Sequence, residues 1–172
     1  MEKIKLNLPD FEYKELTWIE QDNVSSQGRS AEYEEQNEYY RSIGFTVDNT
    51  TYYQCFEVGK DIHDFCKTIF SRYSVSIFKQ PPGSTLPVHE DTFYRFAELN
   101  GIDPYQCCRV NIFLEDWKSG HYLEINGNPV LQWKKGDAIV IKREQPHLSG
   151  NMGVEPKYTM QITGVINELK RR

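Results

Sequence analysis

Residues 108–114, CRVNIFL, place apolar side chains at every second position, and this period of two decides the fold class. Successive side chains of a β-strand point to opposite faces, so the pattern predicts a strand with two different faces. One face carries Val110, Ile112 and Leu114, and the other carries Arg109, Asn111 and Phe113. The same period recurs in YSVSIFK (73–79), HYLEI (121–125), PVLQW (129–133), DAIVIK (137–142) and KYTMQITGV (157–165).

Short segments rich in turn-forming residues separate these strands. They are QPPGS (80–84), NGN (126–128), KKGD (134–137) and SGNMG (149–153). The step from Asn126 to Gly127 carries the signature of a tight β-hairpin. Many short strands joined by turns predict an antiparallel sandwich or barrel.

One face of the last strand is polar. In residues 157–165 it carries Lys157, Thr159, Gln161 and Thr163. Such a face either meets solvent or lines a polar cavity between the two sheets of a jelly-roll barrel, a fold that houses ligands in its interior. The alternation alone leaves both alternatives open.

A helix is expected before the first of these strands. In GKDIHDFCKTIFSRY (59–73) the apolar positions recur at helical spacing, and Asp61 is a candidate N-cap. His63 falls outside the apolar stripe and is interpreted as a solvated helix residue. The apolar positions are Ile62, Phe65, Cys66, Ile69 and Phe70.

Length and composition favour a single domain over residues 1–172. With 172 residues and 38% hydrophobic content, the chain is long enough to bury a core of its own. Residues 1–57 form an N-terminal extension, and residues 58–172 hold the helix and the β core. The polar run from residue 21 to residue 40 predicts a loop or flap that ends in a short helix, acting either as a lid or as an ordinary exposed connection.

Charge and cysteine usage exclude several classes of protein. The formal net charge of −5 gives no broad attraction for nucleic acid or anionic lipid, and the terminal LKRR is interpreted as a solvated end. No apolar run suits a signal peptide or a membrane span, so we expect a cytoplasmic protein. The four cysteines form no CxxC pair and are interpreted as reduced and half-buried: Cys55, Cys66, Cys107 and Cys108.

The stretch STLPVHEDTFYRF (84–96) holds a candidate metal site. Residues i and i+2 of a strand point the same way, so His89 and Asp91 share a face. A third ligand is needed, and His147 is the best candidate because it follows the apolar strand at 137–142. Two imidazoles and one carboxylate suit a non-haem Fe(II) site with open positions. His121 is the alternative ligand, although its place in a turn favours exposure.

Ten residues beyond His147, Lys157 begins the last strand, and Thr159 shares its face. A cation and a hydroxyl aimed into a cavity suit the distal carboxylate of a small dicarboxylate. We expect them on a strand adjacent to the metal. With these residues, the run from residue 87 to residue 165 resembles the double-stranded β-helix core of the Fe(II)/2-oxoglutarate-dependent dioxygenases, particularly their prolyl 4-hydroxylase-like branch.

The connecting strands extend this resemblance. CRVNIFLEDWKSGHYLEI (108–125) is similar to the arginine-led strand, acidic turn and glycine of that family, and LQWKKGDAIVIKREQPH (131–147) to its approach to the distal histidine. Two features depart from the family pattern. Gly120 is followed by His121 where the family usually has paired glycines, and the tyrosine before the HxD motif has no clear match.

The resemblance implies a mainly β, double-stranded β-helix fold of the jelly-roll, cupin-like kind with flanking N-terminal helices. It implies Fe(II) held by His89, Asp91 and His147, with 2-oxoglutarate as cosubstrate bound by Lys157 and Thr159. O2 is the oxidant, and ascorbate is a candidate stimulant. The implied reaction hydroxylates a C–H bond of an amino acid, a peptidyl side chain or a small metabolite and releases succinate and CO2.

Other polar residues are candidates for substrate contact. Arg109 and Asn111 point to the inferred cavity side, and Tyr94 and Arg95 follow the HxD motif. Arg109 has an equal alternative role in a structural ion pair. The three tryptophans are interpreted as core or cavity wall: Trp18, Trp117 and Trp133.

Two other classes of function remain open at this stage. One is a cupin-like metal-binding isomerase or lyase, which would not need Lys157 and Thr159 beside its metal. The other is a non-catalytic barrel that binds a partner through its cavity or flap. A small-molecule or peptidyl substrate is expected, with no nucleic-acid and no membrane partner.

Overall fold

The computed structural model describes residues 2–25 and 31–170. The strands are β1 (Glu2–Lys5), β2 (Ile19–Gln21), β3 (Tyr52–Cys55), β4 (Tyr73–Gln80), β5 (Thr85–His89), β6 (Cys107–Phe113), β7 (His121–Ile125), β8 (Asn128–Val130), β9 (Asp137–Lys142), β10 (His147–Asn151) and β11 (Lys157–Val165). The helices are α1 (Ala31–Ser42), α2 (Val47–Thr50), α3 (Lys60–Ile69) and α4 (Tyr94–Asn100), with short 3₁₀ turns η1 (Pro104–Gln106) and η2 (Ile166–Glu168).

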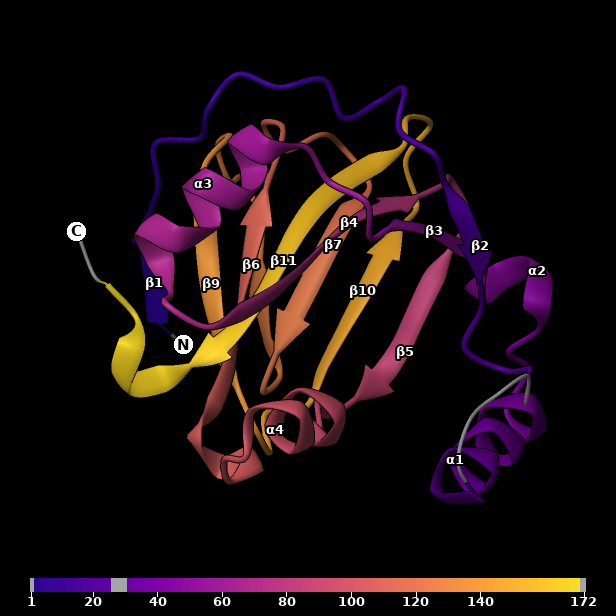
Figure 1. The fold of residues 1–172 in the computed structure, drawn as a ribbon. Coiled ribbons are helices and arrows are strands. Elements are labelled where there is room, and N and C mark those ends of the chain that lie inside the picture. Colours follow the sequence, from indigo (N-terminus) through magenta and orange to yellow (C-terminus); the bar gives the residue numbers. More distant parts are fainter. Residues whose placement is uncertain (1, 26–30, 171–172) are drawn as a thin grey trace.

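The strands form two antiparallel sheets that face each other (Figure 1). The large sheet has the order β1-β9-β6-β11-β4-β3-β2, and the small sheet has the order β5-β10-β7-β8. From β4 onward the pairs nest inside one another: β4 with β11, β5 with β10, β6 with β9 and β7 with β8. Such nesting is one long hairpin folded across two sheets, which is a jelly roll. The mainly β, jelly-roll fold expected from the sequence is therefore confirmed.

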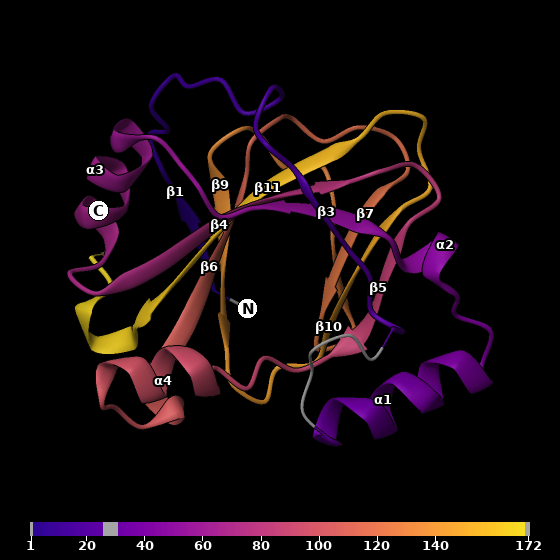
Figure 2. The same ribbon diagram turned by 45° about the vertical axis from the view of Figure 1, so that its right-hand side comes forward.

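The main hydrophobic core lies on the outer face of the large sheet, under α3. Figure 2 shows α3 against this face and away from the small sheet. Ile62 and Cys66 of the helix are buried against apolar residues of the central strands. The strand side of this core is formed by Ile77, Val110, Ile112, Val140, Met160 and Ile162. The apolar alternation in CRVNIFL thus serves the helix side of the sheet, and the polar face is left to point between the sheets.

Helix α3 begins earlier than expected, because its N-cap lies two residues before Asp61. Gly59 is its N-cap and provides no side-chain bond, whereas Asp61 lies within the first turn. The candidate cap at Asp61 was therefore wrong, although an acidic residue in the first turn still stabilises the helix through its dipole. His63 is exposed, as expected, and its Nδ1 lies 3.0 Å from the Tyr73 hydroxyl.

The hairpin at Asn126 and Gly127 is confirmed. The two residues adopt φ values of 52° and 72° and connect β7 to β8. Positive φ at both central positions defines the tight turn whose twist matches the flanking strands.

Three elements differ from the expectations. Residues 149–151 belong to strand β10 and are not a turn, so the strand of His147 was missed. Helix α4, directly after the HxD motif, was also missed. The N-terminal extension contributes β1, β2 and β3 to the large sheet rather than helices alone. Strand β1 pairs with β9 at one edge, and β3 pairs with β4 near the other.

The expected flap falls partly outside the described residues, at positions 26–30. The part that follows is helix α1, and it is held to the barrel: Tyr40 is buried and its hydroxyl donates to the carbonyl of Val88 at 2.5 Å. Residues 171 and 172 of the terminal LKRR also lie outside the described residues. No helix among the described residues is long and apolar enough to cross a membrane.

The four cysteines are free thiols, as expected of a reduced protein. They are fully buried rather than half-buried, because each faces packed side chains of the sheet or of the helices that cover it. Cys66 has the clearest environment, since burial between α3 and the large sheet raises the pKa of its thiol to about 12.

Candidate metal centre

Strands β5 and β10 bring the two histidines of the candidate site together. His89 is the last residue of β5 and His147 is the first residue of β10, and their Cα atoms are partners in the sheet. Asp91 lies in the loop beyond β5, so the expectation that it shares a strand face with His89 was wrong. The loop nonetheless returns its carboxylate: the ligand atoms of His89, Asp91 and His147 lie within 4.8 Å of one another.

Backbone carbonyls fix the orientation of both imidazole rings. His89 Nδ1 lies 2.8 Å from the Pro87 carbonyl, and His147 Nδ1 lies 2.9 Å from the Gln145 carbonyl. A carbonyl only accepts, so each Nδ1 carries the proton and each Nε2 presents a lone pair. Burial, followed by the neighbouring His147, lowers the pKa of His89 to about 4. His89 is therefore neutral at pH 7, the state that binds a metal ion.

Asp91 completes the group with one carboxylate oxygen. Its Oδ1 accepts a hydrogen bond of 2.8 Å from Arg109 Nη1. Its Oδ2 is buried, has no hydrogen-bond partner and lies 3.9 Å from His147 Nε2. A buried oxygen without a partner is costly, and a cation shared with two Nε2 lone pairs would satisfy it. The donor set of two imidazoles and one carboxylate therefore fits a divalent transition metal.

His121 is not part of this group. The sequence favoured exposure for it, and this was wrong: His121 is 3% exposed on β7. Its Nε2 lies 3.0 Å from the carbonyl of Glu155, and its ring stacks near Trp133. Trp133 in turn stacks on Phe113 at 4.0 Å between ring centres. His121 is thus a structural residue of the apolar cluster between the sheets.

A cavity of about 230 Å³ lies between the sheets and reaches both histidines. The polar face of β11 lines it with Lys157, Thr159 and Gln161, so the cavity alternative for that face holds. Arg109 and Asn111 of β6 line it as well.

Lys157 lies deep in this cavity and is 4% exposed. It stands on β11 in the large sheet, whereas His147 stands on β10 in the small sheet. Lys157 therefore faces the metal-bearing sheet from across the barrel, and the expected place on an adjacent strand was wrong. Between β9 and β11 the chain crosses from the large sheet to the small sheet and back, which a count of residues does not reveal.

The ammonium of Lys157 has neutral partners only. Its Nζ donates to the Tyr122 carbonyl at 2.7 Å, to the Gly150 carbonyl at 3.2 Å and to the Ser149 hydroxyl. No carboxylate pairs with it among the described residues, and burial lowers its pKa to about 7. A buried cation without a counter-ion is poised to accept an anion.

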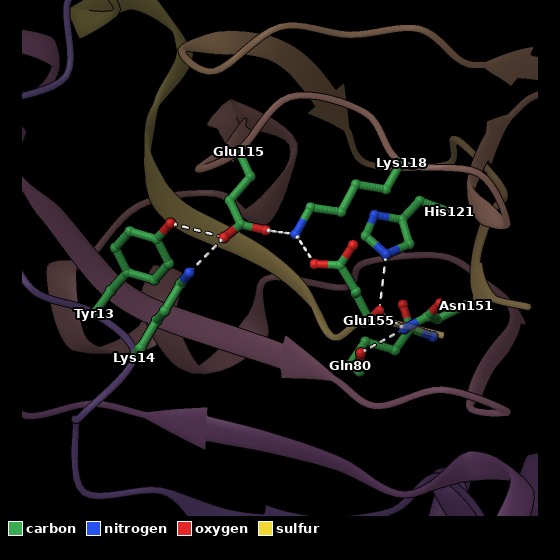
Figure 3. A network of polar contacts seen from close by, with 8 residues as sticks. All are labelled: Tyr13, Lys14, Gln80, Glu115, Lys118, His121, Asn151 and Glu155. Carbon is green, nitrogen blue, oxygen red and sulfur yellow. Dashed lines mark hydrogen bonds and ion pairs between the residues drawn. The ribbon is translucent and has the colours of Figure 1, made fainter. Parts of the chain in front are cut away.

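A polar network includes Gln80, the sheet partner of Lys157, and Figure 3 shows its members. Asn151 Nδ2 donates to the carbonyls of Gln80 and Glu155, each at 2.9 Å. The Lys118 ammonium bridges the carboxylates of Glu155 and Glu115 at 2.7 and 2.9 Å. Glu115 also receives the hydroxyl of Tyr13 and the ammonium of Lys14 from the N-terminal segment.

The backbone is tightly packed near this network. Gly120 has a φ of 88°, and a Cβ there would lie 2.2 Å from the nitrogen of Gly153. Only glycine fits this position, which accounts for the single glycine before His121.

Sequence reasoning missed several residues of the cavity wall. Ser149 donates to Gln80 Oε1 at 2.9 Å, and Gln80 is buried beside it. Asn23, from the N-terminal extension, lines the cavity with a buried amide nitrogen that has no hydrogen-bond partner. The alternation of YSVSIFKQ could have indicated Gln80, whereas no local signal marks Asn23.

The remaining candidates for substrate contact lie outside the cavity. Tyr94 and Arg95 are exposed on α4. Arg143 Cζ lies 5.2 Å from the ring centre of Tyr94 and 4.5 Å from that of Tyr105. Arg109 spans both regions, because it also lines a groove beside α4. Trp133 is a buried residue of the apolar cluster, and Trp117 packs against it. Trp18 packs on the outer core.

Comparisons with known proteins give similarity of structure only. No protein-family model matches the chain, and no curated protein matches it. Among solved structures, a predicted oxalate decarboxylase from Thermotoga maritima has a TM-score of 0.45 and 15% identity, covering 67% of this chain and 81% of its own. The cupin domain of Cnp3 from Schizosaccharomyces pombe has a TM-score of 0.42 and 11% identity, covering 72% and 74%. A non-haem monooxygenase in a nickel complex has a TM-score of 0.43 and 20% identity, covering 65% and 52%.

Proposed function

We propose that this protein is an Fe(II)- and 2-oxoglutarate-dependent oxygenase that hydroxylates a C–H bond of its substrate. The observation that carries the proposal is the pairing of two incomplete sites in one cavity. The donor atoms of His89, Asp91 and His147 converge on one point, and the buried Lys157 ammonium has neutral partners only. A ligand that bears a carboxylate at one end and metal-binding oxygens at the other would complete both.

The metal end supplies three ligand atoms and leaves the remaining positions to ligands from the cavity. Both Nε2 lone pairs are free because each Nδ1 is held by a carbonyl. Arg109 holds Asp91 through Oδ1, so that Oδ2 stays directed at the histidines. This arrangement favours iron over magnesium or calcium, which prefer sites made of oxygen ligands.

The lysine end selects a small dicarboxylate. A carboxylate that reaches Lys157 would restore the charge that burial disfavours, and the Thr159 hydroxyl lines the same wall. In the low dielectric of the cavity such a charge-assisted bond is stronger than a neutral one. The second carboxylate and the 2-keto oxygen of 2-oxoglutarate are then left for the metal.

When bound, Fe(II) and 2-oxoglutarate supply the oxidising chemistry, in which O2, 2-oxoglutarate and R–H give R–OH, succinate and CO2. The chain itself does three things. His89, Asp91 and His147 fix the metal, Lys157 and Thr159 orient the cosubstrate, and the buried walls between the sheets exclude water. Asn111 and Arg109 line the same cavity and would contact the reacting part of a substrate.

Succinate formation tests the proposal. The purified protein is incubated with Fe(II), ascorbate and 2-oxoglutarate, and succinate is measured by mass spectrometry with and without a pool of amino acids, peptides and metabolites. We expect succinate release that depends on Fe(II), together with a product that has gained one oxygen atom. The matched control is His63→Ala, which changes an exposed histidine of α3.

One outcome favours the main alternative. Tight binding of Fe(II) with no succinate under any condition would replace the proposal by a cupin-like metal isomerase or lyase, which needs the metal end alone. Absence of both metal binding and succinate would leave a non-catalytic binding barrel.

A further inference from the structure

A groove of about 510 Å³ runs beside helix α4, outside the cavity. Its rim exposes three large apolar side chains: Phe56 is 52% exposed, Tyr94 55% and Leu99 78%. Phe56 follows β3, whereas Tyr94 and Leu99 lie on α4, so the rim has two sides. Apolar side chains gathered on both sides of a groove indicate a surface that another molecule covers.

The charge of the groove is opposite to that of the protein. The chain carries a net charge of −5, yet the lining of this groove, as far as the described residues go, includes Arg95 and Arg109 and no aspartate or glutamate. Arg109 uses Nη1 on Asp91 and keeps a buried Nε without a partner. Arg95 is exposed on α4. The occupant that complements this surface is therefore acidic and also apolar.

Arg109 connects the groove to the metal centre. It lines both the groove and the central cavity, and it contacts the ligand Asp91 directly. The cavity has only about 230 Å³ and, under the proposed function, must hold the cosubstrate as well. A large substrate cannot lie wholly inside it, so most of its body must lie outside and send one group inward past Arg109.

We propose that this groove binds an acidic peptide segment, with a carboxylate on Arg95 and Arg109 and apolar side chains on the rim, and that the peptide is the substrate of the cavity beside it. The inference rests on the proposed function for the word substrate, but the binding itself does not depend on it. A segment of polypeptide fits because the groove is open at the surface and is more than twice the size of the cavity. Aromatic and aliphatic anchors around a charged contact are the usual composition of a peptide-binding surface.

Selection from a synthetic peptide pool tests the groove. The immobilised full chain is exposed to random-sequence peptides without histidine or cysteine, in the absence of added metal and 2-oxoglutarate, and the retained peptides are sequenced by mass spectrometry. We expect enrichment of aspartate or glutamate next to leucine or aromatic residues. Arg95→Glu and Leu99→Asp change exposed positions and should each reduce that enrichment at least tenfold, whereas Lys135→Glu, an exposed charge reversal that does not line the groove, should leave it unchanged.

Two results would overturn the inference. One is a retained pool without acidic preference, and the other is equal selection by the groove variants and the parent. Its failure is separable from that of the proposed function. Succinate formation without selection of acidic peptides would rule out the peptide groove but not the proposed reaction. Selection of acidic peptides without succinate formation would rule out the reaction but not the groove.

Discussion

The two ends of the barrel differ in whether their buried polar side chains have hydrogen-bond partners. At the end near Lys157, the buried amide of Asn151 and the ammonium of Lys118 all have partners, and a glycine contact closes the backbone. At the metal end, Asp91 Oδ2 and Arg109 Nε are buried without hydrogen bonds. Buried polar atoms are almost always satisfied in folded proteins, so the unpaired Asp91 Oδ2 beside the two histidines favours a bound cation at the metal end.

The backbone shows the same contrast. Phe93 and Glu144, which flank the two loops of the metal centre, have φ values of 56° and 61°. A bulky residue with positive φ is strained by roughly 1–2 kcal/mol. Near the polar network the positive φ values fall on glycine, where they cost little. Gln132, in the loop between β8 and β9, also has a positive φ of 55°, so the contrast concerns the loops of the metal centre and the glycines of the network only.

The largest effect is expected at the metal ligands. Replacing His89, Asp91 or His147 by alanine should abolish Fe(II) binding and leave the fold intact, because the site lies at the barrel mouth and outside the main core. Anaerobic calorimetric titration measures the affinity, and circular dichroism checks the fold. An unchanged Fe(II) affinity in His147→Ala would show that His147 is not a metal ligand. The difference drawn between the two ends of the barrel would then no longer hold.

The next effect concerns the anion at the other end of the cavity. A charge-assisted hydrogen bond contributes roughly 1.5–3 kcal/mol, so Lys157→Met should weaken 2-oxoglutarate binding by about tenfold to a hundredfold. Lys157→Arg should restore binding only in part, because a planar fork must fit a pocket shaped for an ammonium. Iron binding should hardly change. The 2-oxoglutarate dependence of succinate release measures the effect, with Lys142→Met on an exposed position as control.

An unchanged apparent affinity in Lys157→Met would disprove the assignment of Lys157 to the cosubstrate. The metal-only isomerase or lyase would then be the better function.

A smaller effect is expected at Arg143, which ties the two metal loops together. Its Nη1 donates to the carbonyl of Thr92 at 2.8 Å, one residue beyond Asp91, and its own loop leads into His147. Replacing a residue that orients a metal ligand commonly lowers metal affinity by about tenfold to a hundredfold. Arg143→Met should therefore weaken Fe(II) binding by about tenfold and broaden the optical bands of the cobalt-substituted protein. Arg72→Met, which removes a pair with Glu168, is the control. Identical spectra would limit Arg143 to a structural role.

The last effect is a pH dependence of stability, which involves no ligand. Burial lowers the pKa of Lys157 to about 7 in the folded protein, from its usual value of 10.5. The unfolded chain therefore binds more protons between these values, and this residue makes stability rise with pH across that window. The slope is at most about 1.4 kcal/mol per pH unit. Denaturant unfolding from pH 7 to 10 should show this rise in the parent relative to Lys157→Met, and parallel curves would contradict it.

The sequence predicted the strands in which apolar side chains alternate, and it missed β10, in which they do not. The apolar alternation of CRVNIFL and DAIVIK marks β6 and β9 because one face of each meets the core. Strand β10, HLSGN, was read as a turn because its side chains serve the polar network and the metal. Local pattern cannot identify a strand whose two faces are both polar or small.

The candidate site followed the same division. The spacing of His89 and Asp91 marked two neighbouring residues, although the reason given, a shared strand face, was wrong because the strand ends at His89. The burial of His121 depends on Trp133, which is distant in the sequence, so no local signal could indicate it. The same holds for Lys157, whose place opposite the metal follows from the crossing between sheets.

The nested pairing of the strands has a consequence for how the chain folds. His89 and His147 are separated by 58 positions (147 − 89) and become partners only when β5 meets β10. In a chain that closes outward from the Asn126–Gly127 turn, the β7–β8 and β6–β9 pairs precede that step, and each later pair closes a longer loop at greater entropic cost. An ion held by both histidines then acts as a cross-link across that loop, and because it binds the folded state it favours folding by mass action. A metal ion at this site would thereby add stability to a fold that also forms without it.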